Sequence, residues 1–197
     1  MAKWVGKQRD LNVKIAVVGQ SGSGKINIIN QLAVSKGQSS VSTTALADAE
    51  VSRTQFIWPE PLADGTFVRV KIYALCGDPK HQALEQCLLN QADGVVYVVN
   101  CDPQMIHSSR ESLLNMLKNA SSVGIDWQKS VIVMQYNQAD KYPNFIPSDL
   151  DGWLGITNGN VARHITSSEG ENLGVAVMDA AEKVIRRLKQ EATALEG

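Results

Sequence analysis

The stretch that decides the fold is Val13–Asn27, which reads V-K-I-A-V-V-G-Q-S-G-S-G-K-I-N. An apolar run leads into a glycine-rich turn that closes with Gly24-Lys25, and a helical segment follows. This order is typical of a phosphate-binding P-loop, in which glycines let successive backbone N–H groups point at phosphate oxygens. Gly19 to Lys25 matches the pattern G-x-x-x-x-G-K, and the lysine adds a positive charge.

The last position of the P-loop pattern is not met, because Ile26 stands where a serine or threonine would ligate Mg²⁺. A glycine-rich turn can also serve close packing alone, but a lysine at the mouth of such a loop has no packing role. We therefore predict a phosphate site whose metal ligand is missing. Its residues are Gly19, Ser21, Gly22, Ser23, Gly24, Lys25, Ile26 and Asn27.

Size and composition indicate a single globular chain of ordinary kind. It has 197 residues, of which 44% are hydrophobic and 20% charged, and no repeat or linker divides it. We predict one domain over residues 1–197, with its core at 11–190. The net charge of −1 argues against nucleic acid or an anionic membrane as the main partner.

Several features favour a cytoplasmic protein without a direct membrane anchor. The three cysteines form no C-x-x-C pair and are expected to be buried or incidental thiols in a reducing compartment. No apolar run approaches the roughly 18 residues of a membrane span. The first residues lack a signal-peptide core, Ala2 stands where myristoylation needs glycine, and no prenylation cysteine ends the chain.

Apolar runs alternate with helical periodicity along the chain. Strands are predicted over Val13–Val18, Thr54–Trp58, Phe67–Leu75, Gly94–Asn100, Val131–Tyr136 and Val161–Ile165. Residues 35–53, rich in Ser, Thr and Ala, are predicted to form a mobile loop. The pattern predicts an α/β fold with about six strands, mostly parallel with one antiparallel hairpin, and helices on both faces.

Polar residues follow two later strands, at the edge where ligands of a parallel sheet sit. The motif Asn137-x-x-Asp140 can recognise guanine. In that case Asp140 accepts hydrogen bonds from the base, and Asn137 connects this loop to the P-loop. The alternative is an ordinary turn rich in Asn and Asp. In Ser167-Ser168-Glu169 a backbone N–H can meet the base oxygen. Ser168 with Glu171 can equally form a helix capping box.

The isolated histidines and tryptophans are expected to have no part in a metal or nucleotide site. His81, His107 and His164 have no metal-like spacing and are expected at the surface or at helix ends. Trp127 and Trp153 are expected to be local packing anchors.

In order and spacing, the motifs resemble those of Ras-like small GTPases, and more narrowly the MglA family of bacterial gliding-motility and polarity GTPases. The resemblance runs from about Val13 to Leu188. Ser52-Arg53-Thr54, with Phe56 and Pro59, resembles the MglA switch segment. Tyr73–Gly77 resembles the second switch, and Gln135–Asp140 resembles the base-reading loop.

The resemblance implies a Ras-like P-loop G domain that binds GTP or GDP. Besides the P-loop, the implied nucleotide contacts are Thr54, Gly77, Asn137, Asp140, Ser167, Ser168 and Glu169. Arg53 would be an intrinsic finger that stabilises phosphoryl charge, and Thr54 would respond to the γ-phosphate and is the possible ligand if Mg²⁺ is bound. The implied partners are proteins that contact the switch loops, among them a roadblock-type regulator similar to MglB.

Departures from the family pattern predict slow or absent GTP hydrolysis. Ile26 removes the Mg²⁺ ligand, and Asp78 stands where glutamine would orient the attacking water. A carboxylate beside the γ-phosphate costs about 4 kcal/mol at ~4 Å and an effective dielectric of ~20. Gln138 replaces a lysine over the base, and Ala74 replaces a metal-linked aspartate that MglA proteins also lack. Hydrolysis depends on metal and positioned charge, so efficient turnover is not expected.

The leading hypothesis is a degenerate MglA-like small GTPase that binds guanine nucleotide, hydrolyses GTP weakly or not at all, and acts as a protein-interaction switch in cell polarity or motility. The alternative is a pseudo-GTPase scaffold that binds no nucleotide. A third hypothesis is an active GTPase whose metal is held by water and phosphate alone. A P-loop kinase is disfavoured, because Asn137-x-x-Asp140 would then have no role.

Overall fold

The computed structural model describes residues 10–37, 41–46, 49–63, 65–75, 82–126, 129–156 and 161–196. The strands are β1 (Asp10–Val18), β2 (Ser42–Leu46), β3 (Ala49–Ile57), β4 (Phe67–Leu75), β5 (Gly94–Asn100), β6 (Val131–Asn137) and β7 (Ala162–Ile165). The helices are α1 (Lys25–Ser35), α2 (Gln82–Leu89), α3 (Ile106–Ser122), α4 (Pro147–Leu154) and α5 (Val175–Glu196). Short 3-10 turns lie at η2 (Pro103–Met105), η3 (Ala139–Lys141) and η4 (Glu171–Gly174).

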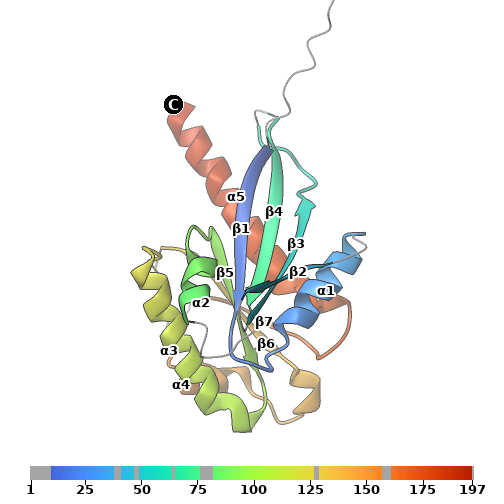
Figure 1. Cartoon of the computed structure of the whole chain (residues 1–197), viewed down its shortest axis with the longest axis vertical. Helices are drawn as coiled ribbons and strands as arrows, with labels where there is room; N and C mark the ends of the chain where they lie inside the picture. The colour runs from blue at the N-terminus through green and yellow to red at the C-terminus, as the bar shows by residue number, and fades with distance from the viewer. Residues whose placement is uncertain are drawn as a thin grey trace, which may run out of the picture.

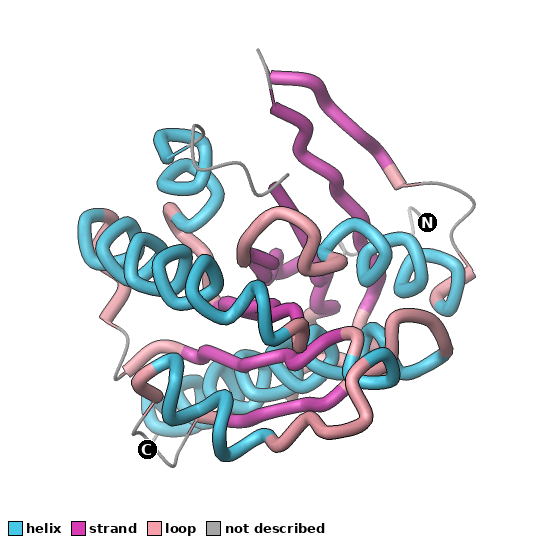
Figure 2. The backbone as a smooth tube through the Cα atoms, turned by 90° about the horizontal axis from the view of Figure 1, so that it is seen from below, coloured by secondary structure: helices cyan, strands magenta, loops and turns pink. Residues whose placement is uncertain are grey.

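The strands of the described residues form one sheet in the order β2-β3-β4-β1-β5-β6-β7 (Figure 1). β2, β3 and β4 pair antiparallel, and the remaining neighbours pair parallel. Helices lie on both sides of the strands (Figure 2). The predicted α/β fold, with a mostly parallel sheet between helices, is confirmed.

Two apolar cores cover the two faces of this sheet. On one face, residues of α1 and α5 such as Ile28 and Val177 pack against alternate residues of β1. On the other face, residues of α2, α3 and α4 such as Met116 pack against the intervening ones. All seven residues of β5 are buried, as its continuous apolar sequence predicted for a strand covered on both faces.

The sheet has seven strands rather than about six, because β2 lies in the segment that was predicted to be a mobile loop. β2 pairs with β3 from Ser42 opposite Arg53 to Leu46 opposite Ala49. The side chains of residues 42–45 are exposed, so no apolar alternation marks this edge strand in the sequence. β3 also begins five residues before the predicted Thr54, because β2 supplies its partner there.

One prediction about isolated residues is wrong: Trp153 is no packing anchor, since it is 64% exposed on α4. His164 lies within β7 with 26% of its side chain exposed, and it is bonded to Asp179. His107 is exposed near the start of α3, as expected, whereas His81 and Trp127 lie outside the described residues. Among the described helices, none is both long and apolar enough to cross a membrane.

Candidate nucleotide-binding site

The loop between β1 and α1 is pressed against the ends of two neighbouring strands. Gly19 and Gly24 adopt φ values of 143° and 93°, which favour glycine. A Cβ on Gly19 would lie 2.2 Å from the carbonyl oxygen of Val98, and one on Gly24 would lie 2.3 Å from Nδ2 of Asn137. Both positions therefore require glycine for close approach, which is the packing role that the sequence left open beside phosphate binding.

Lys25 is folded under the loop and is only 4% exposed. Its ammonium donates to the carbonyl oxygens of Gly19 at 2.8 Å and Gln20 at 2.6 Å, and lies 3.4 Å from the hydroxyl oxygen of Ser23. Three oxygens thus surround a buried charge in the manner expected of a satisfied cation. Contrary to the prediction that this lysine has no packing role, its ammonium also stabilises the loop.

Ile26 and Asn27 point to different environments at the start of α1. Ile26 is partly buried and packs against the core shared by α1, α5 and the sheet, whereas Asn27 is exposed. The position of the usual Mg²⁺ ligand is therefore a hydrocarbon committed to the core. Within the described ranges, no group of three or more His, Cys, Asp or Glu residues could hold a metal ion. Ile26 therefore supplies no oxygen ligand for magnesium at the usual position.

Three side-chain amides hold the carbonyl oxygens of the P-loop. Asn137 donates to Ser23 at 2.8 Å, which is the predicted tie between the two loops. Gln138 donates to Gly22 at 3.0 Å, and Asn100 donates to the same oxygen at 3.2 Å. The carboxyl ends of β5 and β6 thus clamp the P-loop. Asn100 was not predicted, although a polar residue that ends a buried apolar strand was the available signal.

Asn137 is itself held by a buried chain of hydrogen bonds. The hydroxyl of Thr166 donates to Oδ1 of Asn137 at 3.0 Å. The amide nitrogen of Gln135 donates to the Thr166 hydroxyl oxygen at 3.0 Å and to the carbonyl of Leu173 at 2.9 Å. Because Oδ1 accepts from Thr166, the amide nitrogen of Asn137 must face Ser23. Gln135 and Thr166 had no predicted role of this kind.

Asp140 is exposed and bonded to Ser168. Its carboxylate accepts from the backbone N–H of Ser168 at 2.6 Å and from the Ser168 hydroxyl at 2.8 Å. The hydrogen bond from this hydroxyl is the main cause that holds the pKa of Asp140 below its ordinary value. The capping-box alternative is wrong, because η4 begins after Gly170, which has no side-chain cap, and Ser168 bonds Asp140 instead.

Arg53 and Thr54, the described residues implied for the first switch segment, lie on β3 rather than in a loop beside the P-loop. Arg53 is exposed and Thr54 is buried, so they project from opposite faces of β3. Thr54 lies opposite Ile72, which lies opposite Ile15, four residues before Gly19. At about 3.3 Å per residue, this separates Thr54 from the loop by roughly 13 Å along the strands. Gly77 and Asp78 lie outside the described residues, and Ser167 and Glu169 are exposed.

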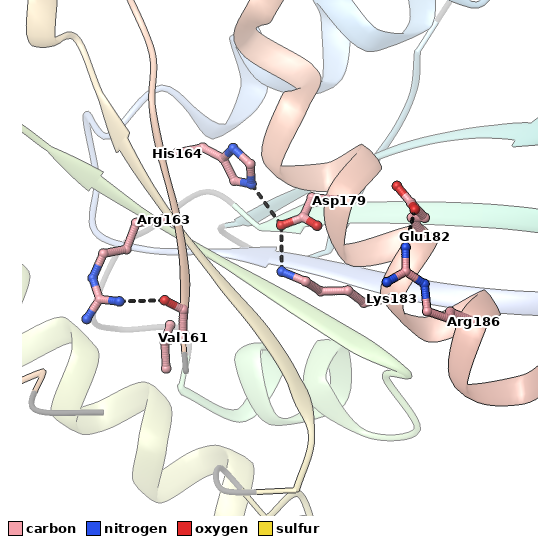
Figure 3. A network of polar contacts seen from close by, with 7 residues as sticks. All are labelled: Val161, Arg163, His164, Asp179, Glu182, Lys183 and Arg186. Carbon is pink, nitrogen blue, oxygen red and sulfur yellow. Dashed lines mark hydrogen bonds and ion pairs between the residues drawn. The ribbon is translucent and has the colours of Figure 1, made fainter. Parts of the chain in front are cut away.

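The strand that leads to Thr166 and Ser168 is fixed to α5 by the ion-pair network of Figure 3. Nε2 of His164 lies 2.8 Å from Oδ2 of Asp179, to which Lys183 also donates at 2.8 Å. Burial raises the pKa of Asp179, but the hydrogen bonds from His164 and Lys183 lower it by more, so the pKa lies below its ordinary value. The network positions β7 and hence the loop after it.

Among the described residues of the P-loop, Gln20 is the one whose buried side-chain polar atoms lack hydrogen-bond partners. Its side chain is 7% exposed, and neither its amide nitrogen nor its amide oxygen has a hydrogen-bond partner. Buried amides are almost always paired, so an orphaned amide in this loop fits a site built for a polar ligand. The glycine cradle and the buried ammonium of Lys25 agree with that.

Two comparisons with known proteins found relatives. The model of the ADP-ribosylation factor family matches residues 1–181. The chain is also similar to the "Mutual gliding-motility protein MglA" of Myxococcus xanthus (strain DK1622). The two are 28% identical over 142 residues, which cover 70% of this chain and 72% of that protein.

Proposed function

The chain belongs to the ADP-ribosylation factor family, which agrees with the resemblance to Ras-like small GTPases that the motifs indicated. We propose that it binds guanine nucleotide and hydrolyses GTP weakly or not at all. The nucleotide would lie at the carboxyl edge of the sheet. The P-loop residues Gly19–Asn27 would hold its phosphates, and Asp140 would accept from its base.

The observation that carries this proposal is the bond from Asn137 to Ser23. It joins the loop expected to recognise the base to the loop expected to hold the phosphates. One ligand with a base at one end and phosphates at the other accounts for both loops and for their connection. A phosphate-only ligand would leave the exposed carboxylate of Asp140 with its bonds to Ser168 alone.

The proposal of weak hydrolysis rests on the residues that would have to assist chemistry. Ile26 offers a hydrocarbon where the metal ligand belongs, and it packs into the core. Arg53 and Thr54 lie along β3, away from the P-loop. Since phosphoryl transfer depends on metal and positioned charge, a site with this composition holds a nucleotide better than it cleaves one.

The biological role is proposed from the relative. Its name assigns it to gliding motility. We propose that this chain likewise acts in motility or polarity in the cytoplasm, as a switch whose state is detected by proteins. The surface detected would include the exposed Arg53 in the β2–β3 region, and a roadblock-type regulator is the proposed partner class.

A second candidate is a scaffold that binds no nucleotide, and one observation favours it. The ammonium of Lys25 is already bonded to carbonyls of its own loop, and the carboxylate of Asp140 is already bonded to Ser168. A site whose charged groups are satisfied internally does not need a ligand to be stable.

Nucleotide content separates the two candidates. The purified protein is denatured in acid, and the released material is resolved by ion-exchange chromatography; the apoprotein is then titrated with GDP, GTP and ATP. Guanine nucleotide on release, or selective binding on titration, supports the proposal. Absence of both would favour the scaffold, and turnover well above the Ras-type intrinsic rate of roughly 10⁻⁴ s⁻¹ would favour an active GTPase.

A further inference from the structure

Part of the sheet is covered by helices on one face only. On one face of β1 and β4, residues such as Val13 and Val70 belong to the core shared with α1 and α5. On the opposite face, α2 contributes to the core that Tyr73 packs against. Figure 1 shows that β1, β3 and β4 continue beyond α2 and α3, while α5 runs along their other side. Over that stretch the described helices leave the second face of the sheet open.

The side chains on the uncovered face alternate with the buried ones along each strand. Strand register places Arg69 of β4 between Asn12 of β1 and Ile57 of β3. Ile57 is 48% exposed and Asn12 is also exposed. With neighbouring strands about 4.8 Å apart, three strands make a surface about as wide as one helix, roughly 10 Å. We call this surface the open strip, and its residues are Asn12, Gln55, Ile57, Arg69 and Lys71.

The face that carries the open strip is positively charged. Lys71 lies opposite Lys14 across β4 and β1, and like charges in that relation are destabilising. The ammonium of Lys14 donates to carbonyl oxygens at the end of α2. Arg69 is paired with Asp10 at 2.9 Å, whereas Lys71 and Arg53 have no ion-pair partner among the described residues. On this face the three strands therefore present four cations and one carboxylate.

We propose that the open strip docks an acidic amphipathic helix of a partner protein. Helices already form the layer on this side of the sheet, and the partner's helix would extend that layer over β1, β3 and β4. Its apolar side would cover Ile57, and carboxylates along its edges would pair with Lys71 and Arg53. Charge complementarity of this kind selects the partner and speeds its association.

The partner is a helix rather than a broad anionic surface. The open strip is about one helix wide, and the chain as a whole has a net charge of −1, which opposes a membrane or nucleic acid. Asn12 lies seven residues before Gly19, which places the strip roughly 23 Å from the P-loop along β1. The inference therefore does not depend on the proposed binding of nucleotide.

The test uses two synthetic helical peptides and the full chain. One peptide has leucines at i, i+3, i+4 and i+7 with glutamates on both sides of them, and the other has lysines in place of the glutamates. Fluorescence anisotropy measures the affinity of each at low and high salt. We expect the acidic peptide to bind about tenfold more tightly than the lysine peptide at low salt, and this preference to shrink as salt rises. Backbone amide shifts in NMR spectra should change in β1, β3 and β4.

Charge reversal separates docking from a loss of folding. Lys71→Glu should weaken the acidic peptide about tenfold and strengthen the lysine peptide, which unfolding cannot produce. Ile57→Ser should weaken both peptides, because the apolar contact is shared. Lys118→Glu, exposed on α3, and Val34→Ser, exposed on α1, are the matched controls and should change neither affinity.

Equal affinity of the two peptides for the wild type would overturn the proposal, as would a preference that Lys71→Glu leaves unchanged. Vesicles that contain phosphatidylserine and a DNA duplex are measured beside the peptides. If either binds at least as tightly as the acidic peptide and loses affinity in Lys71→Glu, the open strip belongs to that anionic surface and the helix is excluded.

Discussion

The side-chain amide of Asn137 donates to the backbone carbonyl of Ser23 at 2.8 Å, although 114 positions separate the two residues in sequence. The bond is buried, and it joins the end of β6 to the loop between β1 and α1. On the other side of the same amide, Thr166 donates to Oδ1. One asparagine therefore links three strand ends, and its removal should lower the stability of the protein as well as its affinity for nucleotide.

Asn137→Ala is expected to lower the free energy of unfolding by about 1–3 kcal/mol, because it leaves the carbonyl of Ser23 and the hydroxyl of Thr166 without this partner in a buried place. Urea denaturation followed by circular dichroism measures the change. Asn144→Ala, in the exposed turn before α4, is the control and should change little. Equal stabilities of the two variants would show that the clamp contributes nothing to the fold.

Asp140→Asn is expected to shift base preference from guanine toward xanthine, because an acceptor pair becomes one donor and one acceptor. Competition of GDP and XDP for the variant and the wild type measures the shift. Asp149→Asn, exposed on α4, is the matched control. Unchanged affinity and selectivity for guanine in Asp140→Asn would exclude Asp140 as the base-recognising residue.

Much of the fold could be predicted because it is encoded in short patterns. The continuous apolar run Gly94–Asn100 specifies a strand buried on both faces, and β5 is buried along its whole length. A glycine-rich turn also allowed close packing, and Gly19 lies close to the backbone of Val98 while Gly24 lies close to the side chain of Asn137. Asn137 was predicted as a tie because strand ends of a parallel sheet meet at one edge.

The features that were not predicted depend on partners distant in sequence. β2 exists because β3 pairs with it, and no local periodicity announces an exposed edge strand. The burial of Lys25 depends on the direction in which the carbonyl groups of Gly19 and Gln20 point in the folded loop. The hydroxyl of Ser168 could have capped a helix or bonded Asp140, and the sequence does not distinguish the two. The position of η3, which carries Asp140, determines that it bonds Asp140.

Ile26→Thr combined with Asp78→Gln is expected to raise GTP hydrolysis above the wild-type rate, which should lie at or below roughly 10⁻⁴ s⁻¹. The first change supplies a hydroxyl at the metal position, and the second removes a carboxylate where a glutamine orients water in the resembling family. Single-turnover phosphate release in excess Mg²⁺ measures it. Since Ile26 packs against the core, thermal unfolding of the variant must be followed in parallel. A wild-type rate many times faster would mean that other residues assist the reaction.

Asp179→Asn is expected to destabilise the protein at neutral pH but not in acid. The pKa of Asp179 in the folded state is lowered, so its stabilisation is fully present above the unfolded pKa of about 3.9 and is lost as the pH falls through the lower folded value. The difference in unfolding free energy between wild type and variant should therefore shrink below about pH 4. Glu182→Gln, which removes an exposed pair with Arg186 (Figure 3), should have little effect at any pH. A constant difference across the range would exclude the ion-pair explanation.

The last prediction is that nucleotide binding is weak and nearly independent of magnesium. Ile26 offers only a hydrocarbon at the usual ligand position, and Asn27 lies about 100° further round the helix. The backbone N–H groups of the P-loop and the ammonium of Lys25 need no metal to meet phosphate. Calorimetric titration with GDP should therefore give similar affinities in Mg²⁺ and in EDTA. Lys25→Ala should weaken GDP binding at least tenfold, as expected for the loss of a charged hydrogen-bond donor. Thermal unfolding checks that this variant stays folded, since Lys25 also holds two carbonyls of its own loop. A large loss of affinity on chelation would mean that other groups hold the metal, and the description of the site as degenerate would fail at Ile26.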